Sequence, residues 1–338
     1  MHEPTLDKFP KKVLASVTME RAFIVSRLVV AAERLQVFRL LEKALPAKAV
    51  ARALDIHPAY LNTFLNSLVA LGLLRRRDEM YSNTRLAEKY FVRERSVHWT
   101  RQYSKECVEG YDALTVLEEA LASGKSCKSI KGLNKVTYTE AMRRDPQRAK
   151  DFTQMLFHYH RDDAEALAKC LDLSKMRSLL DVGGGSGVMS IALARRNPHL
   201  HACVFDIAPV CKAASKNIRS AGMSKRITTL AGDIRQPFPE GHDVIMFCDI
   251  GPVSPELLRN AYESLPANGL TVLVDRYLNR ERTQPLDRVI SQFISGSFPQ
   301  ATSAEMVQVL RACGFARVRA TKVYRDLCCI TGSRRRSF

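Results

Sequence analysis

An acid and a run of glycines stand together at one point of the chain. Residues 179–187 read LLDVGGGSG, so a short apolar strand reaches Asp181 and then enters a glycine turn. Glycine at Gly183 and Gly185 lets the backbone adopt angles, and lets a ligand approach, in ways that a Cβ would prevent. The residues that follow predict a helix over 188–196. A strand, a glycine turn and a helix in this order indicate a site for an anionic or ribose-bearing ligand.

Two further acids follow apolar runs downstream. Asp206 ends the run ACVFD, and Asp233 ends ITTLAGD. Open α/β sheets bind ligands at the carboxyl ends of their strands, where an acid on the second strand accepts hydrogen bonds from ribose hydroxyls. The dinucleotide fingerprint also needs a glycine at the sixth position counted from Gly183, and Val188 stands there. The sequence therefore disfavours a nicotinamide cofactor.

Composition sets the class of protein. With 338 residues, 46% of them hydrophobic, the chain can bury a full core and form two domains. No apolar stretch reaches about 18 residues and no signal peptide begins the chain, so we expect a soluble cytoplasmic protein without a membrane partner. The net charge of +17 fits a nucleic acid, an acidic substrate or a solvated surface alike. Nine cysteines without a CxxC pair, and one tight histidine pair (His158 and His160), predict no metal site.

The first part of the chain, residues 1–100, has the pattern of a winged helix. Apolar residues recur at helical spacing over 14–41 and predict a buried helix pair. A helix, a turn at His57 and Pro58, a second helix and a charged hairpin follow. The second helix carries no Lys or Arg, whereas a helix that reads DNA needs such donors. We therefore expect this domain to pack against another chain and nucleic acid to be an improbable partner.

The rest of the chain predicts an α/β domain behind a helical linker. Residues 101–175 have helical patterns, and residues 176–338 alternate strand and helix patterns. The alternation predicts a parallel sheet with right-handed crossovers. The last two strand patterns, ARVRATKVY and DLCCITG, are separated only by Arg325, and so short a link requires an antiparallel hairpin.

These features resemble the methyltransferase family that uses S-adenosylmethionine. Within it, the chain is similar to the plant-type and bacterial small-molecule O-methyltransferases, which are dimers with a winged-helix first domain. The resemblance covers nearly the whole chain and rests on LLDVGGGSG, VFDIAPV, AGDIRQPFP, LPANGLTVLVD and EAMRRDPQRAKDFTQM. It implies a homodimer, a class I Rossmann-like methyltransferase sheet with an antiparallel last strand, S-adenosylmethionine as the cofactor and a small-molecule acceptor.

The resemblance also assigns site residues. Gly183 and Gly185 would approach the methionine part of the cofactor, and Asp206 would take the ribose hydroxyls. Asp181 would meet the amino group directly or through water, and Asp233 with Ile234 would hold the adenine. The full cofactor set is Asp181, Gly183, Gly185, Asp206, Ile207, Asp233, Ile234 and Cys248. The acceptor pocket would be lined by Met155, Phe157 and His158.

The chain departs from the family at its catalytic base. The family's histidine follows the fourth strand, four residues after a lysine; here those positions are Pro252 and Cys248. Proline has no side-chain proton acceptor. The first hypothesis is an acceptor that needs no dedicated base, such as a carbon or nitrogen nucleophile or an ionised oxygen, on an aromatic, polyketide-like or tetrapyrrole molecule.

Other hypotheses remain open at this point. A different group could act as the base: His158, His160 and Asp249 are the main candidates, with Tyr277 and Cys248 besides. Two helical positions apart, His158 and His160 face different directions, so only one of them points at the pocket. The chain could also be a diverged member that binds ligands or performs other chemistry, or a winged-helix DNA-binding regulator.

Overall fold

The computed structural model describes residues 22–92, 108–133, 136–296 and 301–335. The chain divides into two compact units, Met1–Asp112 and Ala113–Phe338. Each unit has its own hydrophobic core.

The first unit is a winged helix, as the sequence predicted. Its three short strands pair antiparallel in the order β1-β3-β2. Its elements are α2 (Ala22–Arg34), α3 (Val37–Leu40), β1 (Leu45–Pro46), α4 (Ala47–Leu54), α5 (Pro58–Ala70), β2 (Leu74–Arg77), β3 (Met80–Asn83), α6 (Arg85–Ala87) and η3 (Glu88–Val92). The helix pair expected over 14–41 appears as α2 and α3, and its first residues lie outside the described part.

Helix α5 packs on its own unit. Leu61, Leu65 and Leu68 recur every three or four residues and are fully buried in the core of the first unit. The Tyr81 hydroxyl lies 3.0 Å from Asn62 Oδ1 and 2.8 Å from Asn66 Oδ1, which ties the hairpin to this helix.

The second unit begins with helices and continues into one seven-stranded sheet. The helices are α8 (Leu117–Ser123), α9 (Cys127–Ile130), α10 (Tyr138–Arg144), α11 (Pro146–Tyr159) and α12 (Arg161–Cys170). The alternating part contains β4 (Ser178–Val182), α13 (Val188–Arg196), β5 (His201–Asp206), α14 (Ala208–Ser220), β6 (Ile227–Ala231), β7 (Val244–Cys248), α15 (Pro255–Ser264), β8 (Leu270–Arg276), α16 (Leu286–Ile294), α17 (Ser303–Ala312), β9 (Ala316–Tyr324) and β10 (Leu327–Ser333).

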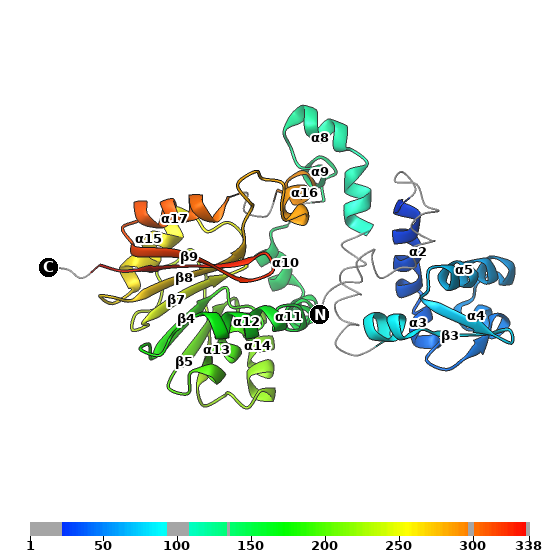
Figure 1. Cartoon of the computed structure of the whole chain (residues 1–338), viewed down its shortest axis with the longest axis horizontal. Helices are drawn as coiled ribbons and strands as arrows, with labels where there is room; N and C mark the ends of the chain where they lie inside the picture. Colours follow the sequence, from blue (N-terminus) through cyan, green and yellow to red (C-terminus); the bar gives the residue numbers. More distant parts are fainter. Residues whose placement is uncertain (1–21, 93–107, 134–135, 297–300, 336–338) are drawn as a thin grey trace. The chain divides into compact units, whose positions relative to one another are not determined.

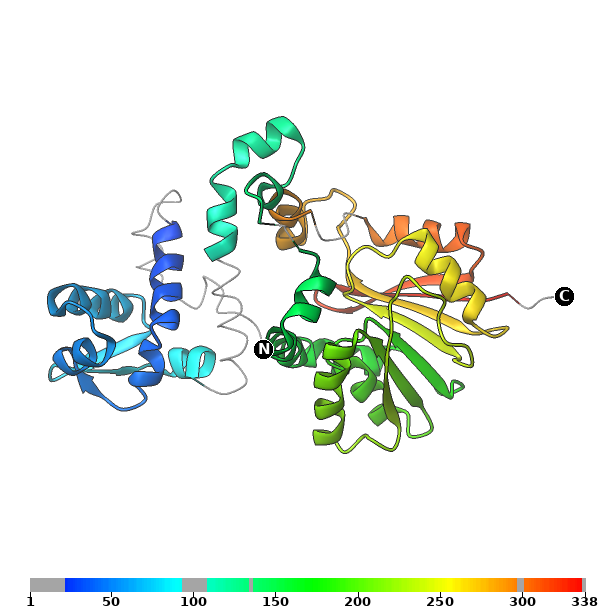
Figure 2. The same ribbon diagram turned by 180° about the vertical axis from the view of Figure 1, so that it is seen from behind.

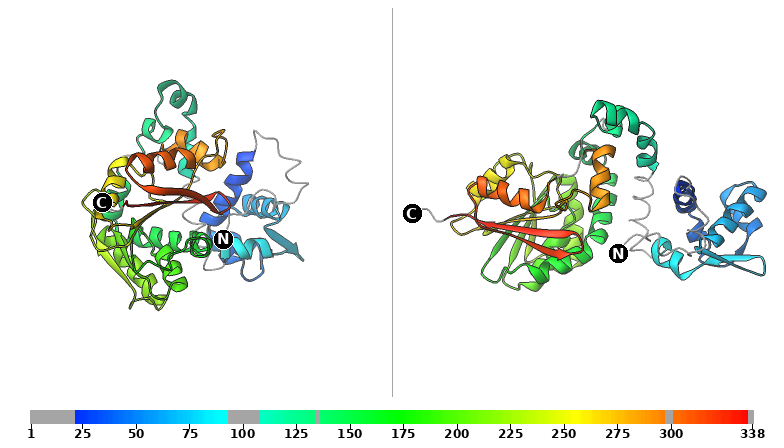
Figure 3. Two further views of the ribbon diagram at one scale, coloured as in Figure 1. Left: turned by 60° about the vertical axis from the view of Figure 1, so that its left-hand side comes forward. Right: turned by 45° about the horizontal axis from the view of Figure 1, so that its top comes forward.

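The strand order is β6-β5-β4-β7-β8-β10-β9. The first five strands are parallel, whereas β10 runs antiparallel to both β8 and β9. Arg325 has a φ of 52°, and the hairpin returns the chain along the edge of the sheet (Figure 3). The predicted parallel sheet with its antiparallel final strand is therefore confirmed.

Helices cover both faces of this sheet (Figures 1 and 2). Side chains alternate along each strand, so Leu179 packs with α12, α13 and α14, while Leu180 packs with α15 and α17 on the other face. Because β4 to β8 are parallel, their carboxyl ends share one edge. The acids singled out in the sequence all lie at this edge.

Candidate functional site

The glycine loop, residues 183–187, leaves β4 under tight steric limits. Gly183 has a φ of 65°, and a Cβ there would lie 2.6 Å from Ile250 Cγ2. A Cβ on Gly184 would lie 2.6 Å from Asp181 Cγ. Contacts under about 3 Å are not tolerated, so both positions require glycine. The Gly183 N–H donates to the Phe205 carbonyl at 2.8 Å, which anchors the loop to β5.

Asp181 lies beneath this loop and is fully buried. Its Oδ2 accepts a hydrogen bond from Ser190 Oγ at 2.6 Å, and Oδ1 has no partner among the described residues. Burial raises the pKa of Asp181 to about 7. A buried carboxyl oxygen without a partner is costly, so Oδ1 is a place where a water or a ligand donor would be stabilising.

Asp206 is fixed by backbone donors. Oδ2 accepts from the Gly185 N–H at 2.9 Å and Oδ1 accepts from the Ile207 N–H at 2.7 Å. Burial raises its pKa above the ordinary value, although both hydrogen bonds oppose this. An ionised carboxylate offers about four lone-pair sites, so roughly two stay available for a ligand.

Asp233, after β6, has a different environment. Arg235 Nε and Nη2 donate to its carboxylate at 2.9 and 2.6 Å, and this ion pair lowers the pKa of Asp233. Arg143 Nη2 is 4.0 Å away. Ile234 is partly buried against the core beneath α15 and α17. An ionised acid beside an apolar side chain can bind the polar edge and the flat face of a base.

At the ends of β7 and β8 lies a set of paired charges that we call the buried ion network. It consists of His160, Asp163, Asp249, Asp275, Arg276 and Arg288. When all six side chains are ionised, three positive charges balance three negative ones.

His160 is the centre of this network. Its Nδ1 is 3.3 Å from Asp163 Oδ2, and its Nε2 is 3.3 Å from Asp249 Oδ2. Burial by itself would lower the pKa of His160, but the hydrogen bonds to these carboxylates raise it above the ordinary value. Arg276 Nη2 also donates to Asp163 Oδ2, at 2.6 Å. The two carboxylates therefore favour the protonated form of His160.

Arg288 closes the other end of the network. Its Nη2 donates to Asp249 Oδ1 at 2.9 Å and lies 3.2 Å from Asp275 Oδ1. Burial opposes ionisation of Asp249, yet His160 and Arg288 lower its pKa. Burial, with the charge of Asp249 added, raises the pKa of Asp275 to about 7. The two acids therefore differ in protonation although one guanidinium contacts both.

Cys248 and Tyr277, the other candidates for the base, are not members of the buried ion network, and neither is Pro252 at the position of the family's histidine. Burial raises the pKa of the Cys248 thiol well above its ordinary value, so it stays protonated. Pro252 is exposed in the loop after β7. Tyr277 is buried in the core beneath α15 and α17.

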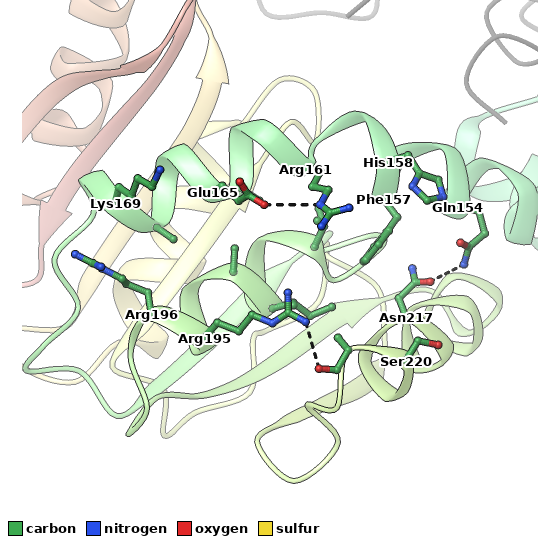
Figure 4. A pocket seen from close by; sticks show the side chains of 16 residues that line it. Gln154, Phe157, His158, Arg161, Glu165, Lys169, Arg195, Arg196, Asn217 and Ser220 are labelled. Carbon is green, nitrogen blue, oxygen red and sulfur yellow. Dashed lines mark hydrogen bonds and ion pairs between the residues drawn. The ribbon is translucent and has the colours of Figure 1, made fainter. Parts of the chain in front are cut away.

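The three residues expected to line the acceptor pocket lie in different surroundings. Met155 is buried, whereas Phe157 and His158 line a groove between α11–α12 and α13–α14, which we call the outer groove (Figure 4). The lining of the outer groove includes none of the residues expected to bind the cofactor and none of the buried ion network. His158 and His160 do face different surroundings, as their helical spacing predicted.

Sequence reasoning missed Asp163, Asp275, Arg276 and Arg288. Helix α16 explains one of these misses, because it buries Arg288 at 5% exposure while Leu286, Ile290 and Phe293 are 57%, 36% and 38% exposed. An amphipathic pattern predicts the opposite orientation. The one signal in the sequence that could have pointed to Arg288 is that it is the single arginine among the apolar residues of α16.

The glycine loop and its acids fit the expected S-adenosylmethionine. Asp181 Oδ1 is buried without a partner, and Asp206 keeps acceptor sites beside a loop that glycine alone permits. Positively charged and hydroxyl-bearing groups suit these acceptors. Among the described residues, no group of three or more His, Cys, Asp or Glu could hold a metal ion. In the same part of the chain, no helix is long and apolar enough to cross a membrane.

Comparison with known proteins identifies the family. Residues 115–316 match the O-methyltransferase domain, and residues 19–93 match the O-methyltransferase dimerisation domain. The 3-hydroxy-5-methyl-1-naphthoate 3-O-methyltransferase of Streptomyces sahachiroi is 28% identical over 288 residues, which cover 82% of this chain and 81% of the relative. The L-tyrosine C(3)-methyltransferase of Streptomyces lavendulae is 31% identical over 288 residues, covering 80% and 76%.

The solved structures agree on the fold. Human N-acetylserotonin methyltransferase in complex with S-adenosylmethionine has a TM-score of 0.80 and 21% identity, covering 96% of this chain and 98% of that one. Matches of both parts to one enzyme family do not favour a DNA-binding regulator or a non-methylating protein. The chain belongs to the O-methyltransferase family and is an S-adenosylmethionine-dependent methyltransferase.

Proposed function

We propose that this enzyme, as a homodimer, methylates a small aromatic or macrocyclic acceptor whose attacking atom is already nucleophilic. Such an atom is an ionised oxygen, a nitrogen or an electron-rich carbon. One observation carries the proposal. His160 and Asp249 are the main candidates to replace the family's catalytic histidine as a base, and both are already engaged in ion pairs, with each other and with Arg288.

A general base must be able to take up a proton near neutral pH. Asp163 and Asp249 raise the pKa of His160 and engage both of its ring nitrogens, so neither nitrogen is left to take a proton from an acceptor. Asp249 is ionised, but its two oxygens face His160 and Arg288, which lower its pKa and make it a weak proton acceptor. We assign both residues a positioning role. His158 lines the outer groove, so we assign it no catalytic role.

The cofactor supplies a methyl group on a sulfonium, which carries the driving force for in-line displacement. Asp206 would bind the ribose hydroxyls through its remaining lone pairs, and Asp233 with Ile234 would hold the adenine. Asp181, under Gly184, would act on the amino group through a water. Gly183, Gly185, Ile207 and Cys248 would form the walls.

The main task of the chain is then to orient two reactants and exclude water. Holding them at near-attack distance supplies roughly 7 to 11 kcal/mol of the barrier reduction in well-oriented systems. The buried ion network joins α11–α12, the ends of β7 and β8, and α16 into one rigid wall. Fixed charges on this wall can orient an anionic acceptor without taking a proton from it.

The names of two relatives support an acceptor of varied chemistry. By their names, one acts at an oxygen of a hydroxynaphthoate and the other at carbon C(3) of tyrosine. Both acceptors carry a hydroxyl group on an aromatic ring, and this phenol group is what they share. We therefore propose a phenol or phenolate-bearing aromatic molecule as the first acceptor class to test.

The test uses S-adenosylmethionine with a carbon-13 methyl group and a panel of hydroxynaphthoates, aminonaphthalenes and phenolic amino acids. Nuclear magnetic resonance then distinguishes methyl on oxygen, nitrogen or carbon. We expect transfer to at least one phenol-bearing member, and slower transfer with Asp206→Ala at low cofactor concentration. Tight cofactor binding without transfer to any member would contradict the proposal.

The homodimer is supported by the dimerisation domain over residues 19–93 and by Phe23 and Ile24, which α2 leaves exposed. Sedimentation equilibrium should give twice the chain mass of 38.0 kDa. A monomer at micromolar concentration would contradict this part.

A further inference from the structure

The outer groove is a cavity that the methyl-transfer site does not use. It has a volume of about 640 Å³ and lies between α11–α12 on one side and α13–α14 on the other (Figure 4). Pockets for small organic ligands have volumes of roughly 300 to 1,000 Å³. The outer groove is therefore large enough for a molecule of two or three rings.

The floor of the groove is apolar because two packed helices present small residues. Ala164 and Ala168 lie one turn apart on α12, and they face Val188 and Ile191 of α13; all four are buried. Phe157 adds an aromatic wall.

The rim is strongly positive. Arg161, Lys169, Arg195 and Arg196 all line the groove, against a single acid, Glu165. Glu165 Oε1 is 3.7 Å from Arg161 Nε, which leaves an excess of three positive charges. Lys169 and Arg196 have no acidic partner among the residues that the structure describes. Charges of one sign around an apolar floor favour an anion with an apolar body.

The groove is separated from the glycine loop by a hydrogen-bonded wall. Gln154 Nε2 donates to Asn217 Oδ1 at 2.6 Å, and Asn217 Nδ2 donates to the Ser186 carbonyl at 3.1 Å. Both side chains line one end of the groove, and the Gln154–Asn217 bond is drawn in Figure 4. Ligands in the groove and in the cofactor site would thus lie on opposite sides of this wall.

We propose that the outer groove binds a small organic anion, with an aromatic or alkyl body on the alanine floor and a carboxylate, sulfonate or phosphate at Arg195, Arg196 and Lys169. The Arg195 side chain is already held in place to bind such an anion, because its Nη2 donates to the Ala221 carbonyl at 3.3 Å. The source of the anion is either a free metabolite or the headgroup of a lipid, and the two share this chemistry.

The test measures binding of 1-anilinonaphthalene-8-sulfonate to the full chain saturated with S-adenosylhomocysteine, so that the cofactor site is filled. The probe has aromatic rings and one sulfonate. We expect one saturable site whose affinity falls as salt rises. In Arg195→Gln/Arg196→Gln, the affinity should fall at least tenfold.

The matched control is Arg319→Gln/Lys322→Gln, which removes the same charge from exposed positions of β9 and should leave affinity unchanged. Ala192→Glu, which places a carboxylate at the groove lining, should also abolish binding. N-phenyl-1-naphthylamine lacks the sulfonate, so its weaker binding should not respond to the arginine variant. Circular dichroism verifies that each variant is folded.

Equal losses in the groove and control variants would overturn the proposal, as would unchanged affinity in Arg195→Gln/Arg196→Gln. Vesicles of phosphatidylglycerol identify the source. Co-sedimentation that the groove variant loses, and the control variant keeps, supports a lipid headgroup. Probe binding without co-sedimentation supports a free anion.

Discussion

The two halves of the sheet edge hold their acids in different ways. Around β4, β5 and β6, Asp206 is fixed by backbone N–H groups, and Asp181 keeps one oxygen without a partner in the described structure. Around β7 and β8, Asp249 and Asp275 are paired with side-chain cations. The acids of the first half therefore keep hydrogen-bond acceptor sites for a ligand. Those of the second half are paired with cations of the buried ion network.

This difference separates binding from rigidity. A carboxylate held by backbone donors keeps its position and can still bind a cofactor. A carboxylate paired with buried Arg and His side chains instead fixes the helices that carry those cations. We therefore expect changes in the first half to affect cofactor affinity, and changes in the second half to affect stability and its pH dependence.

The largest effect should come from breaking the ion network. Arg288→Met leaves Asp249 and Asp275 without their shared cation, and loss of one partner of a buried pair costs about 3 to 5 kcal/mol. Urea denaturation measures the change in the free energy of unfolding. Arg259→Met, which breaks the exposed pair with Glu256, should cost less than ~1 kcal/mol. Equal costs would mean that the network does not stabilise the fold.

The next effect concerns the cofactor half. Asp206→Ala removes the carboxylate that we propose as the acceptor for the ribose hydroxyls and should weaken binding of S-adenosylhomocysteine by ~1 to 3 kcal/mol. Isothermal titration calorimetry measures this change. Asp326→Ala, in the turn between β9 and β10, serves as the control and should bind normally. If Asp206→Ala binds S-adenosylhomocysteine with unchanged affinity, Asp206 does not bind the ribose hydroxyls.

A third effect is the pH dependence of stability. The pKa of His160 is raised, so its stabilising contribution is complete below the unfolded value and is lost as pH rises through the folded value. Asp275, with its pKa raised to about 7, acts in the same direction, because the folded state holds a proton that the unfolded state has released. Unfolding free energy should therefore fall from pH 6 to pH 8.

Two variants isolate these groups in the same urea experiment. Asp275→Asn should reduce the fall between pH 6 and pH 8, and His160→Gln should reduce the fall that continues above pH 7. Wild-type stability that rises over this interval would contradict the assigned pKa directions.

The smallest effect should follow Pro252→His. A missing general base would be worth roughly 10²- to 10⁴-fold in rate, but an acceptor that is already nucleophilic gains little from one, so we expect a change in kcat below about threefold. Formation of S-adenosylhomocysteine measures the rate. Pro252→Asn controls for the altered loop, and a large increase specific to histidine would show that proton removal limits the reaction.

The sequence predicted the strand, turn and helix order of the sheet because its signals are local. The strand, glycine turn and helix around Asp181 are contiguous, and Arg325 alone required the final hairpin. The ion network was not predictable in this way, because Asp163 and Arg276 are 113 positions apart and Asp249 and Arg288 are 39 positions apart. Helix α16 also buries its arginine instead of its apolar side. No periodicity rule could have paired these residues.

The most direct test of the central claim is the pH dependence of kcat/KM for phenols of graded acidity. We predict that the rising limb follows the pKa of each phenol and moves with it, because the acceptor brings its own charge and the chain removes no proton. A limb that stays near the ordinary histidine pKa of about 6.5 for every phenol, and that disappears in His158→Ala or His160→Ala, would contradict the account.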